Sequence, residues 1–188
     1  MVRNLKITFY NLYSHSSIMG SRFSLKFLKM QNLIETWEIN QKMNELLING
    51  ITEEYFSDRA ISKSRSAGEQ LTHLHNVRLM WLAAAMPELL PLQKKFEKEE
   101  SFSKQTLIEE MKKSSQAISA LLKAGFSSGK IKGFKPHPEA FLGYMVAHEA
   151  HHRGQIILIL KQNGHMPDKK FYTGFGNGEQ NNVIEDSL

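Results

Sequence analysis

The sequence contains no cysteine, and this absence excludes several kinds of chemistry. Without thiols the chain has no disulfide, no thiolate metal ligand and no cysteine nucleophile. Any thiol chemistry must therefore use a small-molecule thiol. A composition without cysteine is compatible with a reducing compartment, and we expect a cytoplasmic protein.

Long apolar runs are also missing, and so is a basic patch on the main part of the chain. No run approaches the roughly 18–20 apolar residues that cross a bilayer, so we expect no membrane partner. The formal charge of +5 arises in residues 1–29, which hold five basic residues and no acidic one, while the remainder holds 19 of each. A nucleic-acid-binding face is unsupported, and we expect no nucleic-acid partner.

The length of 188 residues, 41% of them hydrophobic, suits one domain with a full core. The acid-free residues 1–29 loosely resemble a transit peptide, but a start codon assigned too early, with Met30 as the natural start, is the plainer interpretation. We expect residues 1–29 to be irregular or loosely attached. Residues 30–175 are the predicted domain, and residues 176–188 are a predicted flexible tail.

Four long helical patterns follow one another along the chain. Ser66 with Glu69 predicts a capping box at the start of the second helix, and Thr106 with Glu109 predicts another at the third, which we expect to end at Gly125. No βαβ alternation, phosphate-binding glycine loop or internal repeat is visible. We therefore predict an all-α fold, a four-helix bundle, a class that often holds metal between facing helices. The expected helices span residues 32–49, 66–85, 106–124 and 138–164.

Two histidines four residues apart, His148 and His152, stand in the fourth predicted helix. Residues at this spacing share one helix face, so both imidazoles can point at one metal ion. They interrupt a mostly apolar stripe that includes Phe141, Met145 and Ile156. Buried imidazoles need partners, because an unpaired buried polar group costs on the order of 1–3 kcal/mol. A metal ion would satisfy both, and a pair of hydrogen-bonded core histidines is the alternative.

The second predicted helix supplies a third ligand. His73 lies one turn before Val77 on the apolar face that includes Trp81, whereas His75 lies on the flank of that face with Leu79. We therefore predict His73 as the ligand and keep His75 as the fallback. For His75 we expect a partly exposed or hydrogen-bonded ring.

The residues from His148 to His152 also spell H-E-x-x-H, the zinc metalloprotease motif, in which Glu149 would be the general base. The extended form of the motif fails at Gln155, where it needs glycine. A distant glutamate ligand would have to be Glu179 or Glu185, and neither stands on a convincing helix. No sheet edge to hold a peptide is obvious. Glu149 also points about 100° away from the preceding residue around a helix. Protease activity is therefore a minor alternative.

The His-x-x-x-His-Arg-Gly-Gln run from His148 to Gln155, followed by an apolar helix ending at Gly164, resembles the DinB/YfiT-like superfamily. The upstream segment from Leu71 to Leu82 is similar to the first-ligand helix of that superfamily, and the resemblance covers roughly residues 30–171. The superfamily includes bacterial thiol-dependent transferases. The resemblance implies a four-helix bundle of DinB/YfiT type that holds a divalent metal through His73, His148 and His152. It also implies a frequent homodimer, and it does not imply DNA binding.

Three imidazoles without a carboxylate leave coordination positions open, the pattern of a catalytic site. Imidazole suits several metals, among which zinc and nickel are our first expectations. An open site can lower the pKa of a thiol or of water, and the resemblance favours a low-molecular-weight thiol that attacks an electrophilic carbon. The alternatives are a metal-dependent hydrolase and a stress-related protein that binds metal or a small ligand without catalysis.

No catalytic residue is predicted beyond these ligands. Arg153 and Gln155 are candidates for orienting a ligand or the substrate, and helix packing or interface hydrogen bonds are an equal alternative. His151 is expected near the edge of the site. No role is predicted for His15, His137 and His165.

Overall fold

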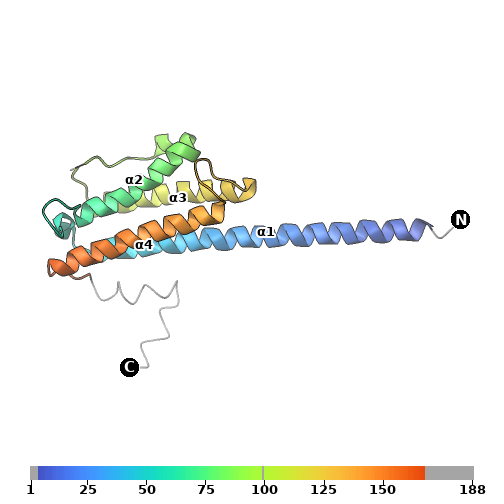
Figure 1. Ribbon diagram of the computed structural model, residues 1–188, viewed down its shortest axis with the longest axis horizontal. Coiled ribbons are helices and arrows are strands. Elements are labelled where there is room, and N and C mark those ends of the chain that lie inside the picture. Colours follow the sequence, from blue (N-terminus) through green and yellow to red (C-terminus); the bar gives the residue numbers. More distant parts are fainter. Residues whose placement is uncertain (1–3, 99, 168–188) are drawn as a thin grey trace, which may run out of the picture.

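In a computed structural model the chain forms four long helices that lie side by side as a bundle (Figure 1). The structure describes residues 4–98 and 100–167, with side chains at 25, 27–98 and 100–167. Helices α1 and α2 each pack against both α3 and α4. The predicted all-α four-helix bundle is confirmed, and the described residues contain no β-strand. The elements are α1 (Asn4–Asn49), η1 (Glu53–Ser57), α2 (Ala67–Ala85), η2 (Pro87–Leu92), α3 (Lys104–Ser128) and α4 (Pro138–Gln162), where η marks a 3₁₀ helix.

Helix α1 begins at Asn4, and its N-terminal part projects away from the bundle (Figure 1). Residues 4–29 are therefore helical, where the sequence predicted an irregular or loosely attached segment. This segment has no proline and one glycine, so its sequence contains no strong helix terminator. The choice of Met30 as the start and the limits of the 30–175 domain stay predictions. The expected tail at 176–188 lies outside the described residues.

The N-terminal caps follow the predicted chemistry in α2 but not in α3. Ser66 Oγ accepts a hydrogen bond from the Glu69 amide at 3.1 Å, and Glu69 accepts one from the Ser66 amide at 2.7 Å, which confirms the capping box. In α3 the cap is Ser103, whose hydroxyl accepts from the Thr106 amide at 3.1 Å. The predicted cap at Thr106 is wrong, because Ser103 satisfies the same free amide one turn earlier.

Helix α3 also continues past Gly125, where the sequence predicts its end. The helix ends instead at Gly129, which has a φ of 76° in the left-handed region. Gly125 serves close packing, because a Cβ added there would lie 2.7 Å from Cγ1 of Ile131. Glycine at this point lets the following loop pack directly on the helix.

The hydrophobic core consists of two clusters separated by a layer of buried polar side chains. Along α1, Trp37 belongs to one cluster and Leu47 to the other, with Asn40 and Asn44 buried between them. The other helices contribute Arg78, Ser114, Glu149 and Arg153 to the buried polar set. The candidate site described below belongs to this middle part of the bundle. None of the described helices combines the length and apolar character that a membrane crossing requires.

Candidate metal centre

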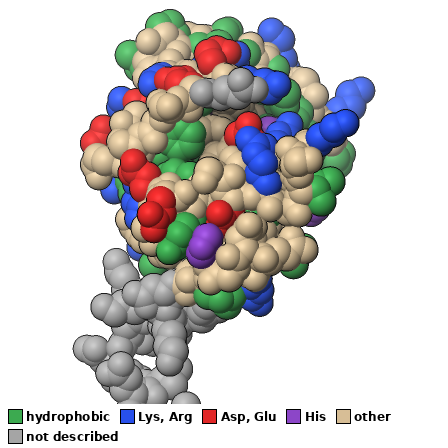
Figure 2. Space-filling view, turned by 90° about the vertical axis from the view of Figure 1, so that its left-hand side faces the viewer, with side chains coloured by type: hydrophobic (Ala, Val, Ile, Leu, Met, Phe, Trp, Pro, Cys, Tyr) green, Lys and Arg blue, Asp and Glu red, His purple; other side chains and the backbone are tan. Residues whose placement is uncertain are grey.

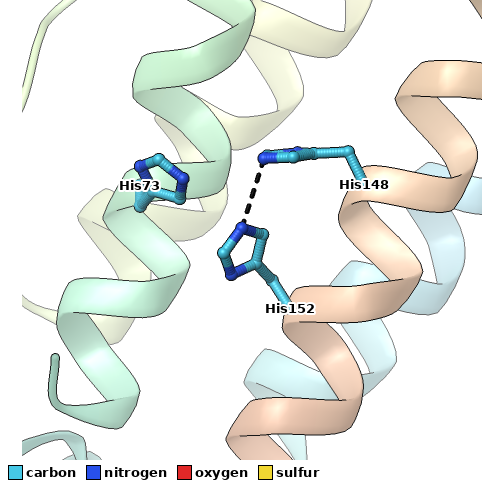
Figure 3. Close-up of side chains that lie close together, drawn as sticks. All are labelled: His73, His148 and His152. Carbon is cyan, nitrogen blue, oxygen red and sulfur yellow. Dashed lines mark hydrogen bonds between the residues drawn. The ribbon is translucent and has the colours of Figure 1, made fainter. Parts of the chain in front are cut away.

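His73 on α2 faces His148 and His152 on α4, and the three imidazoles converge between the two helices (Figure 3). One nitrogen from each ring lies within 4.8 Å of the other two. The Nε2 atoms of His148 and His152 are 3.2 Å apart. The ring centroid of His73 lies 5.5 Å from that of His148 and 4.7 Å from that of His152. The structure therefore brings together the three residues that the sequence predicts as metal ligands.

The spacing of these nitrogens fits a divalent metal ion. Bonds of about 2.0–2.1 Å place two nitrogens of a tetrahedral site about 3.3 Å apart, close to the separation in the His148–His152 pair. Within the described residues, His73 forms no hydrogen bond, and no carboxylate joins the three histidines. The donor set is therefore three imidazoles, with positions left for an exogenous ligand.

A glutamine on α2 sets the tautomer of one of these histidines. Gln70 Oε1 lies 2.6 Å from Nδ1 of His152 and accepts its N–H. This bond leaves the lone pair of His152 on Nε2, the nitrogen that faces His148. Gln70 was not predicted as part of the site, although it precedes His73 by three residues and so lies near it on the helix surface.

Electrostatics keeps all three imidazoles neutral near pH 7. Burial, followed by the positive charge of Arg65, lowers the pKa of His73 to about 4. Burial and the two neighbouring ligand rings lower the pKa of His152 to about 4. Burial also lowers the pKa of His148. Neutral imidazole is the form that binds metal, so the lone pairs are available without loss of a proton.

The ring of His148 is oriented by packing more than by hydrogen bonds. Its Nδ1 atom is buried and has no hydrogen-bond partner among the described residues. The ring stacks on Tyr144, one turn earlier on α4, with centroids 6.0 Å apart and an interplanar angle of 29°. The Nε2 atom on the opposite side of the ring faces the other two histidines (Figure 3).

His75 does not join the three histidines. It is fully buried, and its Nε2–H donates to the carbonyl oxygen of Lys94 at 2.7 Å. Its Nδ1 lies 3.1 Å from Ser114 Oγ, so both ring nitrogens have partners. The predicted hydrogen-bonded role is confirmed, the expected partial exposure is wrong, and the fallback ligand is removed.

Glu149 lies on the opposite side of α4, inside the polar layer. Its carboxylate accepts hydrogen bonds from Nε of Arg78 at 2.7 Å and from Nη2 of Arg78 at 2.9 Å. The amides of Asn40 and Asn44 donate to the same group at 2.5 and 2.7 Å. Burial opposes ionisation, but the Arg78 charge and these donors hold the pKa of Glu149 below its usual value. Glu149 is therefore an ionised structural group that ties α1 and α2 to α4.

This position of Glu149 removes the geometric basis for a metalloprotease. A general base must lie beside the open side of the metal site, whereas all four donors to Glu149 come from the bundle interior. The described residues offer no strand edge for a peptide substrate. Glu179 and Glu185, the candidates for a distant ligand, lie outside the described residues.

The two candidates for orienting groups have other partners. Arg153 is buried, and its Nη1 donates to Asn40 Oδ1 at 2.9 Å and to Asn44 Oδ1 at 2.7 Å. Gln155 is hydrogen-bonded to the exposed His151, with Nε2 atoms 2.9 Å apart. Arg153 therefore supports the polar layer. A substrate-orienting role for either residue stays a prediction.

Of the three histidines without a predicted role, two have partners away from the metal centre. His137 caps α4 by accepting from the Ala140 amide at 3.2 Å. His165 lies 2.7 Å from an Asp58 carboxylate oxygen and stacks on Tyr55. His15 belongs to the part of α1 whose side chains are not described.

Comparisons with known proteins agree with this architecture. The chain resembles the solved structure of a DinB-like protein from Bacillus subtilis, at 21% identity and a TM-score of 0.54, over 72% of this chain and 94% of that one. A protein described as a DinB-family member from Exiguobacterium sibiricum matches at 19% identity and a TM-score of 0.51, over 76% of this chain and 96% of that one. No curated protein matches the chain in sequence. The family model for the DinB family matches residues 24–182, and the chain therefore belongs to the DinB family.

Proposed function

We propose that this DinB-family protein is a metal-dependent transferase that joins a low-molecular-weight thiol to an electrophilic substrate. The supporting observation is the site of three neutral imidazoles from His73, His148 and His152 without a protein carboxylate or thiolate. Such a donor set leaves positions open to an exogenous ligand. Zinc and nickel are the proposed metals, because both accept imidazole ligands.

A bound divalent metal would supply positive charge that lowers the pKa of a thiol or of water toward neutrality. The chain's own residues prepare the site for that role. Burial keeps the imidazoles unprotonated, and Gln70 directs the Nε2 lone pair of His152 toward the other ligands. In the proposed reaction a bond forms between the thiol sulfur and an electrophilic carbon. The leaving group departs with the bonding electrons, and the thiol proton passes to solvent.

The proposed partners are therefore a small thiol and an electrophile, with a second copy of the chain as a proposed homodimer partner and the cytoplasm as the proposed location. The absence of cysteine means that no internal thiol competes with the exogenous one. A hydrolase that uses water at the same site, and a metal-binding protein without catalysis, remain alternatives.

The test is thiol consumption by zinc- and nickel-loaded protein with chlorodinitrobenzene as electrophile and a panel of small thiols. We expect product formation that requires both metal and thiol and that is lost in His148→Ala. The exposed His137, at the start of α4, offers the matched control, and His137→Asn, which keeps a side chain able to cap the helix, should retain activity. Turnover of an activated ester by the loaded protein without thiol would favour the hydrolase. Stoichiometric metal binding with no turnover of either substrate class would favour the binding protein.

A further inference from the structure

A cleft of about 440 Å³ runs along α2 and has one of the candidate ligands in its wall. Its floor is one face of the helix, with Thr72, His73 and Asn76, and its far side is the segment that carries Phe96 and Phe102. Arg65 lines the same cleft, immediately before the α2 cap. A molecule in this cleft therefore lies against His73, one of the three candidate ligands.

The charges that line this cleft are paired, with one exception among the described residues. Glu69 pairs with Arg59 at 2.7 Å, and Glu97 pairs with Lys95 at 3.0 Å. The third lining carboxylate, Glu100, pairs with Lys94 at 2.8 Å.

Arg65 is exposed and has no acidic partner among the described residues. Lys98 also lines the cleft, and its charge lowers the pKa of Glu69. Figure 2, which views the left-hand end of the bundle in Figure 1, shows acidic and basic side chains both present there. The lining of the cleft likewise holds three basic and three acidic residues, so we expect individual charged groups to select the ligand.

Arg65 and His73 line the same cleft, with Arg65 just before the N-cap of α2 and His73 about two turns into the helix. A ligand of moderate length can therefore reach both the metal centre and Arg65.

We propose that the small molecule that reaches the metal through this cleft carries an anionic group, and that Arg65 binds this group. Guanidinium recognises carboxylate and phosphate through two parallel N–H donors, a geometry that lysine cannot offer. This inference rests on the proposed function, because it assigns the substrate class of the thiol. Arg65 is the specificity-determining residue and takes no part in bond making.

The test uses two thiols of matched length, mercaptohexanoate and mercaptohexanol, titrated into the full-length protein loaded with cobalt(II). Thiolate-to-cobalt charge-transfer absorption reports binding without any turnover. We expect the carboxylate thiol to bind about five-fold more tightly than the alcohol at low salt, the ratio for an exposed ion pair of about 1 kcal/mol. The preference should vanish in Arg65→Met, shrink in Arg65→Lys and weaken with added salt.

Lys95→Met is the matched control, because it removes a positive charge from the same cleft where that charge is already paired. This variant should keep the preference, and binding of mercaptohexanol should be equal in all variants. Equal affinities for the two thiols in the wild type, or an unchanged preference in Arg65→Met, would overturn the assignment and leave the thiol function standing. Equal losses of preference in Arg65→Met and Lys95→Met would also overturn it, because they would show only general electrostatics. No thiolate band with either thiol, while cobalt stays bound, would refute the proposed thiol function and this inference together.

Discussion

Replacing Glu149 with alanine is predicted to destabilise the bundle by about 3–5 kcal/mol. The carboxylate and the Arg78 guanidinium are both fully buried, and two hydrogen bonds join them. Alanine would leave Arg78 as a buried cation without its counterion. It would also remove the acceptor of the Asn40 and Asn44 amides. These three groups lie inside the core, where water cannot replace the lost carboxylate.

The more conservative substitution, Glu149→Gln, removes the negative charge and keeps the size of the side chain. Glu149→Gln keeps one acceptor oxygen but turns an amide toward groups that are already donors. Glutamine also leaves the Arg78 cation without its counterion, but the retained acceptor and side-chain volume reduce the cost, so we expect a loss of about 2–3 kcal/mol. Domains of this size are stable by roughly 5–15 kcal/mol. The glutamine variant should therefore fold and bind metal like the wild type.

The assay is urea unfolding followed by circular dichroism, with metal content measured on the same samples. We expect lower midpoints with unchanged slopes, in the order wild type, Glu149→Gln, Glu149→Ala. A loss below about 1 kcal/mol in Glu149→Ala would refute the structural role, because a broken buried ion pair should exceed that value. A Glu149→Gln variant that is fully stable but unable to hold metal would instead place Glu149 in the metal centre.

Three further predictions concern α2 and α3. The hydrogen bond from Arg59 holds the pKa of Glu69 below its ordinary value of 4.5. The ionised Glu69 carboxylate therefore stabilises the fold fully above pH 4.5, and this stabilisation is lost as the pH falls through the lowered pKa. In thermal unfolding, the difference in melting temperature between wild type and Glu69→Gln should shrink in acid and stay constant in base. Gln70→Leu should weaken metal affinity by about 10–100-fold, measured by chelator competition, and an unchanged affinity would show that Gln70 does not orient the His152 ring. Gly125→Ala should destabilise by about 1–3 kcal/mol in urea unfolding, because the added methyl would overlap the Ile131 side chain, and a gain in stability would contradict this packing.

Much of the site could be predicted from helical periodicity. The four-residue spacing of His148 and His152 fixes a common helix face, and the register of α2 separates His73 from His75 by about 200°. These are local properties of the chain, and the structure agrees with them. The Ser66–Glu69 capping box was predictable for the same reason.

The polar layer could not be predicted, because its partners are far apart in sequence. Nothing near Arg78 indicates that its counterion is Glu149, or that Asn40 and Asn44 donate to the same carboxylate. The start of α1 was missed for another reason. The absence of acidic residues suggested a leader segment, but it does not prevent a helix in a stretch without proline.

The most direct test of the account is the metal content of untagged protein, measured by elemental analysis after reconstitution with zinc or nickel. We expect about one metal ion per chain in the wild type, because three ligands form one site. We expect loss of that metal in His73→Ala, His148→Ala and His152→Ala, and retention in His75→Ala if that variant folds. The three histidines would not form a metal site if the wild-type protein took up no metal, or if a triple variant of His73, His148 and His152 still held it.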